Sequence, residues 1–179
     1  MMANRRTEMT LPLRYVLVLA MGAIGSIVAR SVSAQQQLLV PMDDRQGNAL
    51  KAYGLVFNAL RDGNKAEWLL NYRGGSFLLP DVSDVRKRAT LDGITFVPIS
   101  APDVGALRTE IASANMDIVS LERAPKIAIY KPLKSPPWDD AVSLALKYAG
   151  IDFTSVYDEE VMNGDLTKVD WLHLHHEDF

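Results

Sequence analysis

The last third of the chain alternates extended and helical patterns, and this alternation constrains the fold most strongly. A β-branched run spans 126–130, an amphipathic stretch spans 137–149, and two further extended runs span 152–157 and 169–175. Parallel strands need a crossover connection, and a helix is the usual one, so this order predicts a parallel, doubly wound sheet. The loops after the three strands would then lie together at the carboxyl edge of the sheet, where ligands of such folds bind.

The beginning of the chain has the three-part pattern of a secretory signal peptide. Arg5 and Arg6 precede an apolar stretch at 15–29, and small residues at 31–34 form a cleavage point of the usual type. The apolar stretch is shorter than the roughly 20 residues that a membrane-spanning helix needs. We therefore expect residues 1–34 to be removed and the mature protein to be exported to the periplasm or the extracellular space. Membrane contact would occur only through this segment, if it is not cleaved.

The mature chain would be acidic and free of cysteine. Residues 1–34 hold four of the 19 Lys+Arg and one of the 22 Asp+Glu, so residues 35–179 keep 15 basic and 21 acidic side chains, a formal charge of −6. A surface of this sign is a poor match for nucleic acid. The absence of cysteine excludes disulfides, thiolate metal sites and a cysteine nucleophile within the chain. The partners that remain are a small molecule or an envelope protein.

A second set of alternating elements precedes the last third. The patterns predict helices at about 43–61, 81–93 and 100–114, and strands at 67–72, 77–79 and 94–99. Ser100 before Pro102 is a typical helix start, because serine caps the first turn and proline fits within it. The mature chain is therefore expected to contain an N-terminal α/β module at 35–122 and a second α/β unit at 123–179.

The first candidate site is a turn formed by Arg73, Gly74, Gly75 and Ser76 between two apolar runs. Successive backbone N–H groups in such a turn can form a nest around an anion, and Arg73 would add positive charge. The alternative is a tight turn that only connects two strands.

The second candidate is the loop 131–140, which follows the first predicted strand of the last third. Its three prolines remove N–H donors, and Asp139 and Asp140 put negative charge at the start of a helix, so a phosphate cradle is disfavoured. The pattern favours a helix whose acids complement its dipole, with Trp138 packing as a lid.

The third candidate is the end of the last predicted strand, which holds every histidine of the chain. His173, His175 and His176 lie within a few residues, followed by Glu177 and Asp178. Strand alternation places His173 and His175 on one face, and two imidazoles beside carboxylates are a start for a zinc or other divalent-metal site. The alternative is a set of hydrogen-bonded histidines at the rim of a buried parallel strand.

The ends of the three predicted strands are expected to form one polar site. In a doubly wound sheet the first strand lies between the second and the third, so the three loops flank a switch point. Imidazoles beside carboxylates would exchange protons near neutral pH or bind a divalent cation. The ligand-binding candidates at this site are Trp138, Asp158, Glu159, His176, Glu177 and Asp178.

Several segments resemble a family of exported bacterial proteins that carries the name asparagine synthetase B. The segments are 68–77 (WLLNYRGGSF), 124–130 (APKIAIY), 137–142 (PWDDAV), 156–161 (VYDEEV) and 170–179 (DWLHLHHEDF). The resemblance covers essentially the whole mature chain, and its last segment is the most specific. It implies the fold of class I glutamine amidotransferases, a three-layer α/β/α parallel sheet of flavodoxin-like type. It also implies that the family continues past residue 179, so that 123–179 is the first half of a domain.

The residues depart from the family's enzymes at the points that carry chemistry. In amidotransferases the final strand leads into a glycine-rich oxyanion loop, and this chain has His175, His176, Glu177 and Asp178 there instead. The synthetase's own cysteine and Ser-Gly-Gly phosphate loop do not occur either. The resemblance thus implies an exported amidotransferase-like protein of uncharacterised activity, serving as a binding or assembly component. Two alternatives remain: a metal-dependent hydrolase that uses the His, Asp and Glu cluster, and glutamine-dependent amide transfer with a nucleophile beyond residue 179.

Overall fold

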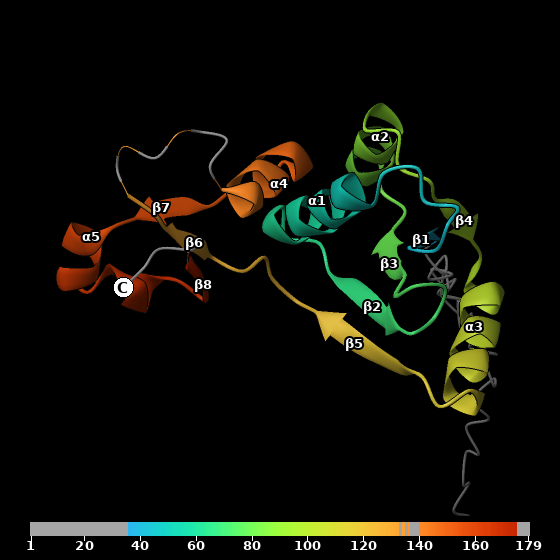
Figure 1. The fold of residues 1–179 in the computed structure, drawn as a ribbon. Coiled ribbons are helices and arrows are strands. Elements are labelled where there is room, and N and C mark those ends of the chain that lie inside the picture. The colour runs from blue at the N-terminus through green and yellow to red at the C-terminus, as the bar shows by residue number, and fades with distance from the viewer. Residues whose placement is uncertain (1–35, 133, 135, 137–139, 175–179) are drawn as a thin grey trace, which may run out of the picture. The chain divides into compact units, whose positions relative to one another are not determined.

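The structure is a computed structural model that describes residues 36–132, 134, 136 and 140–174 (Figure 1). Its elements in chain order are β1 (Gln37–Val40), α1 (Ala49–Arg61), β2 (Ala66–Leu70), β3 (Phe77–Pro80), α2 (Ser83–Leu91), β4 (Val97–Ile99), α3 (Ala101–Ser113), β5 (Asp117–Leu121), β6 (Ile127–Tyr130), α4 (Ala141–Ala149), β7 (Thr154–Val156), α5 (Asp158–Met162), the 3-10 helix η1 (Asp165–Lys168) and β8 (Trp171–Leu174). This mixture of helices and strands confirms the predicted α/β class.

Strands β1 to β5 form an antiparallel sheet, called sheet A. Its strand order is β4-β1-β3-β2-β5, and all four neighbouring pairs are antiparallel. The parallel arrangement of the predicted fold class therefore does not extend to this part of the chain. For β2 and β3 the antiparallel pairing follows from the short turn 71–76 that joins them. Parallel strands would need a crossover of a dozen or more residues.

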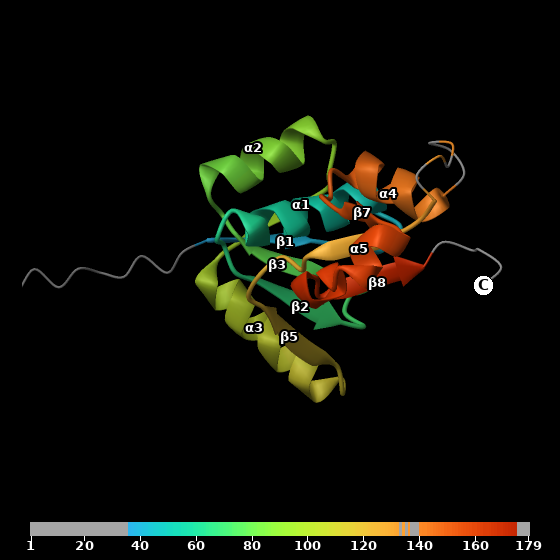
Figure 2. The same ribbon diagram turned by 90° about the vertical axis from the view of Figure 1, so that its left-hand side faces the viewer.

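Helices cover both faces of sheet A, with α1 and α2 on one side and α3 on the other (Figures 1 and 2). Neighbouring residues of β1 point to opposite faces, so Leu38 packs beneath α1 and α2 while Leu39 packs against α3. The core on the α1 and α2 side includes Leu38, Val40, Ala52, Leu55, Val56, Ala59, Leu60, Phe77, Leu79, Val85 and Ala89. The core on the α3 side consists of Leu39, Leu69, Leu78, Leu107 and Ile111.

The predicted helix starts are confirmed at α3 and corrected at α1. Ser100 caps α3, and its side chain and that of Asp103 form a reciprocal capping box. Helix α1 begins at Ala49 with Asn48 as its cap, not near residue 43, because the segment before it forms a turn in which Asp43 accepts a hydrogen bond from the Arg45 N–H. Strands β1 and β5 were not predicted.

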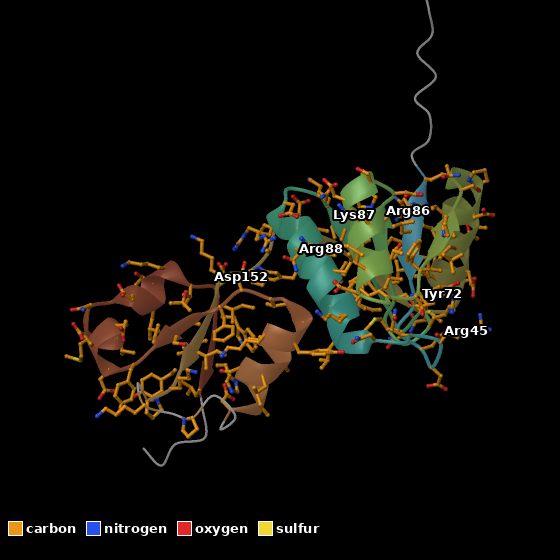
Figure 3. All side chains as sticks on the ribbon, turned by 90° about the horizontal axis from the view of Figure 1, so that it is seen from above. Arg45, Tyr72, Arg86, Lys87, Arg88 and Asp152 are labelled. Atoms are coloured by element: carbon orange, nitrogen blue, oxygen red, sulfur yellow. The ribbon has the colours of Figure 1, made fainter. Side chains whose placement is uncertain are left out.

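Helix α2 carries a run of basic side chains, Arg86, Lys87 and Arg88 (Figure 3). Val85 and Ala89 of the same helix are buried in the core, so the basic residues point away from it. Arg86 pairs with Asp81, and its guanidinium lies 5.5 Å from the centre of a phenylalanine ring.

Strands β6, β7 and β8 form a parallel sheet, called sheet B, with the order β7-β6-β8. The predicted parallel pairing and the central position of β6 are confirmed. The interior of β6 is buried on both faces, as Ala128 and Ile129 have no exposed surface. Helix α4 connects β6 to β7 and begins after its cap, Asp140. The predicted start at 137 lies outside the described residues.

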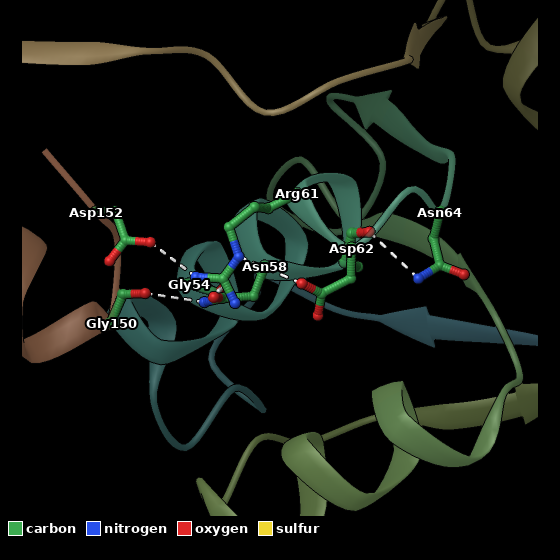
Figure 4. A network of polar contacts seen from close by, with 8 residues as sticks. Gly54, Asn58, Arg61, Asp62, Asn64, Gly150 and Asp152 are labelled. Atoms are coloured by element: carbon green, nitrogen blue, oxygen red, sulfur yellow. Dashed lines mark hydrogen bonds and ion pairs between the residues drawn. The ribbon is translucent and has the colours of Figure 1, made fainter.

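Helix α1 contacts α4 closely, although α1 packs on sheet A and α4 belongs to sheet B (Figure 4). A Cβ atom at Gly54 would lie 1.8 Å from the carbonyl oxygen of Ala149, so only glycine fits there. The buried Asn58 donates from Nδ2 to the carbonyl oxygens of Gly54 (2.7 Å) and Gly150 (2.9 Å). Both sheets belong to one compact unit, Val32–Phe179, and the predicted division after residue 122 stays a prediction.

Two further expectations concern residues that the structure does not describe. The signal peptide at 1–34 lies outside the described part, and its cleavage stays a prediction. Among residues 36–132, 134, 136 and 140–174, no helix has the length and apolar character needed to span a membrane.

Candidate functional site

The end of β6 meets the segment that follows β7 at the carboxyl edge of sheet B. Tyr130, the last residue of β6, donates from its hydroxyl to Asp158 Oδ1 at 2.6 Å. The rings of Tyr130 and Tyr157 lie 5.4 Å apart between centroids. Two strands that are distant in sequence therefore contribute aromatic and acidic side chains to one place, as the predicted order of the strands requires.

The acidic side of this edge is the start of α5. Asp158, Glu159 and Glu160 occupy its first turn, where negative charge complements the helix dipole. Glu160 accepts the backbone N–H of Tyr157 at 2.8 Å, so it closes the helix start. Asp158 and Glu159, the two predicted ligand-binding candidates in this turn, are both exposed. Asp158 contacts Tyr130 at the end of β6.

A second polar cluster joins β8 to the start of α4. Asp140 is only 5% exposed and accepts hydrogen bonds from the N–H of Val142 (3.1 Å), the N–H of Ser143 (2.9 Å) and the hydroxyl of Ser143 (2.5 Å). His173 Nε2 lies 3.7 Å from the other side of the same carboxylate, at Oδ1. The histidine side chain keeps 27% of its surface exposed, so it faces both the buried acid and the outside.

Asp140 is held as an anion by its neighbours. Burial raises the pKa of the Asp140 carboxyl. Hydrogen bonds from Ser143 and Val142, together with the nearby His173, lower the pKa by a larger amount, so it lies below its ordinary value. The negative charge of Asp140 faces the Nε2 side of the His173 ring across 3.7 Å, which is longer than a hydrogen bond. The other ring nitrogen then remains for a ligand.

The serine of this cluster is not placed as the nucleophile of a catalytic triad. In a Ser-His-Asp triad the histidine lies between the serine and the acid. Here Ser143 donates directly to Asp140 and is 1% exposed, so its oxygen is turned away from any ligand.

The metal hypothesis rests mainly on residues outside the described part. Within the described ranges, no group of three or more His, Cys, Asp or Glu side chains could hold a metal ion. His173 is the one predicted metal ligand that the structure places. The other predicted residues of this cluster lie outside the described residues: Trp138, His175, His176, Glu177 and Asp178.

The predicted anion-binding turn uses several of its own polar groups internally. Arg73 Nε donates to Asp43 Oδ2 at 2.8 Å. The N–H groups of Gly75 and Ser76 both donate to the carbonyl oxygen of Tyr72, at 3.1 and 3.0 Å. Ser76 is fully buried, so the turn shapes the β2–β3 connection, and anion binding there stays a prediction.

Sequence reasoning missed three members of the site. The sequence pattern indicates Tyr130 only as the end of a strand, and Asp140 only as an acid at a helix start. Ser143 stands three residues after Asp140, which is the spacing at which a capped helix brings N-cap and N3 together. That spacing was the signal that could have found the Asp140–Ser143 pair.

Comparison with protein-family models, curated proteins and solved structures found no match to this chain. The similarity to class I glutamine amidotransferases therefore rests on the quoted sequence segments and enters below as a proposal.

Proposed function

We propose that the chain is an exported, amidotransferase-like α/β protein that binds a small polar molecule at the carboxyl edge of sheet B. The observation that carries this proposal is the central position of β6 between β7 and β8. In doubly wound sheets, ligands bind where neighbouring connections leave a central strand in opposite directions, because a crevice opens there.

The proposed fold is a parallel three-layer domain of the class I glutamine amidotransferase type, to which sheet B contributes. Helix α4 lies in the connection from β6 to β7, and α5 with η1 lies in the connection from β7 to β8. Since β7 and β8 flank β6 on opposite sides, right-handed connections place these helices on opposite faces of the sheet.

The proposed ligand contacts are Tyr130 and Asp158 on one side of the carboxyl edge and His173 on the other, so the ligand would reach across the end of β6. Tyr130 and Asp158 present a hydroxyl and a carboxylate, which match the amino and amide groups of a small polar molecule such as glutamine. His173, which faces Asp140, offers one ring nitrogen that can donate or accept a hydrogen bond. Export to the periplasm or extracellular space remains part of this proposal, on the basis of the N-terminal pattern.

A metal-dependent hydrolase is the second candidate, and the Asp140–His173 pair favours it. Metal-binding histidines commonly donate their other N–H to a carboxylate, which fixes the ring and raises its basicity. His173 Nε2 lies 3.7 Å from Asp140 Oδ1, so the two groups would have to approach by a few tenths of an ångström to make this contact. A metal would then bind the other nitrogen together with side chains after residue 174.

The experiment is calorimetric titration of the full chain with glutamine and, separately, with Zn²⁺ and Mn²⁺. The test variant is His173→Gln, and the matched control is Thr109→Ala on the exposed surface of α3. We expect saturable glutamine binding in the wild type and control and about tenfold weaker binding in His173→Gln, the effect of one hydrogen bond to a charged group. Equal glutamine affinities in all three proteins would contradict the proposal. Metal binding that only His173→Gln loses would favour the second candidate.

A further inference from the structure

A pocket extends from the amino-terminal ends of β6 and β7 to the first turn of α5, where it includes Glu160. Its volume is about 400 Å³. The walls come from the end of α1, the segment 124–126, the starts of β6 and β7, and the region of α5 and η1. The floor is apolar, since Phe57, Ile127 and Val156 line the pocket and each is less than 10% exposed.

The rim of this pocket carries charges of both signs. They are Arg61, Lys126, Lys168, Asp152, Glu160 and Asp165. Arg61 binds Asp152 at 2.8 Å (Figure 4), and Lys168 binds Asp165 at 2.5 Å. Glu160 accepts the backbone N–H at the start of α5 at 2.8 Å. Each acid at the rim therefore already has a partner.

Lys126 differs from the other charges at the rim. Within the described ranges its ammonium group has neither a hydrogen bond nor an ion pair. Its backbone N–H donates to Asp170 Oδ2 at 2.8 Å, which fixes the start of the side chain beside the pocket. Asp170 itself is bound by both terminal nitrogens of Arg123, at 2.6 and 2.8 Å. The Lys126 ammonium attracts the Asp170 carboxylate through space, but it forms no direct ion pair with the described residues and is therefore available to a ligand next to the apolar floor.

We propose that this pocket binds a small molecule that has an apolar body and a single anionic group, with the carboxylate class as its simplest form. The apolar body would cover Phe57, Ile127 and Val156, and the anionic group would pair with the ammonium of Lys126. A second negative charge on the ligand would meet the acids at the rim and weaken binding. None of the ligand contacts proposed at the carboxyl edge lines this pocket, and the proposal does not depend on the function proposed there.

The probes are 3-phenylpropionate and its neutral amide, titrated into the full chain near neutral pH and at low salt. The test variant is Lys126→Met, which keeps most of the apolar stem, and the matched control is Lys147→Met on the exposed surface of α4. We expect the carboxylate to bind more tightly than the amide. Lys126→Met should weaken carboxylate binding by about tenfold and leave the amide unchanged, whereas Lys147→Met should change neither.

A second variant tests the pocket without removing the charge. Thr154 lines the pocket from the exposed edge strand β7, and phenylalanine is well tolerated in strands. Thr154→Phe should abolish binding of both probes, because the ring occupies the pocket. The proposal is overturned if neither probe binds saturably, if Lys126→Met binds the carboxylate as tightly as the wild type, or if Thr154→Phe leaves both affinities unchanged. Glutamine titrations of Lys126→Met report separately on the carboxyl edge, where we expect no change.

Discussion

Replacing Gly54 with alanine tests the close approach of α1 and α4. The added Cβ atom would lie 1.8 Å from the carbonyl oxygen, 2.8 Å from the carbonyl carbon and 3.3 Å from the Cα of Ala149. Cβ atoms in real structures do not come closer than 3.0 Å to such atoms, and here the obstacle is backbone, which cannot rotate away. The two helices would have to separate by about 1 Å or more in a closely packed region.

Opposing effects determine the size of the change in stability. Alanine stabilises a helix interior by about 1 kcal/mol relative to glycine. Overpacking costs about 1–3 kcal/mol. Separation of the helices also moves Gly150 away from Asn58 Nδ2, which leaves a buried amide with one acceptor fewer and costs about 1–3 kcal/mol. We therefore expect Gly54→Ala to lower the free energy of unfolding by about 1–5 kcal/mol.

The matched control is Gly105→Ala, also in a helix interior. No heavy atom lies within 4 Å of the Cβ that would be added at Gly105 of α3. The higher helix propensity of alanine is therefore the only effect expected on stability at this position. Gly105→Ala should raise the free energy of unfolding by about 0.5–1 kcal/mol. Urea unfolding of the full chain, followed by circular dichroism, measures both changes. A Gly54→Ala protein as stable as Gly105→Ala would refute the close contact between α1 and α4.

Three further expectations concern the helix starts and the N-terminus. Asp140→Asn should lower the free energy of unfolding by about 1–3 kcal/mol, because the donors of Val142 and Ser143 lose a charged acceptor; unchanged urea midpoints would contradict this. The pKa of Asp140 is lowered from its ordinary 3.8, so this carboxylate stabilises the fold fully above pH 3.8 and loses that effect as the pH falls through the lowered pKa. The free energies of unfolding of the wild type and Asp140→Asn should therefore become equal in strong acid. Ser100→Ala should cost about 1 kcal/mol through loss of the α3 cap, as measured by thermal unfolding, and an unchanged melting temperature would speak against the capping box. A tagged full chain should appear in the periplasmic or extracellular fraction with a mature start near Gln35, whereas unprocessed chain in the cytosol would disprove export.

Sheet B could be predicted because its signals are local in the sequence. The β-branched run that became β6 is followed by a capped helix and a further extended run, and that order dictates a parallel crossover. The central position of β6 followed from the strand order that is usual in doubly wound sheets. The acid at the start of α4 was recognised, while its contact with His173 depends on how α4 packs and has no local signal.

Sheet A could be predicted only in part, because its pairings join distant segments. Strand β1 is a run of four residues after several glutamines, too short to show alternation, and its partners β3 and β4 lie far along the chain. The turn 71–76 was the one local sign of antiparallel pairing. From the sequence alone, Gly54 is only a residue that weakens a helix. The need for glycine at this position follows from the backbone of Ala149, which packs against it in the structure.

The most direct test of the central claim is an amide NMR titration of the isotope-labelled full chain with glutamine. If the carboxyl edge of sheet B is the ligand site, saturable shifts should concentrate on the backbone amides of Tyr130, Asp158 and His173. These residues belong to three different segments that meet only in a parallel sheet with β6 at its centre. Saturable shifts confined to sheet A, or a complete absence of shifts at these three residues, would contradict the account.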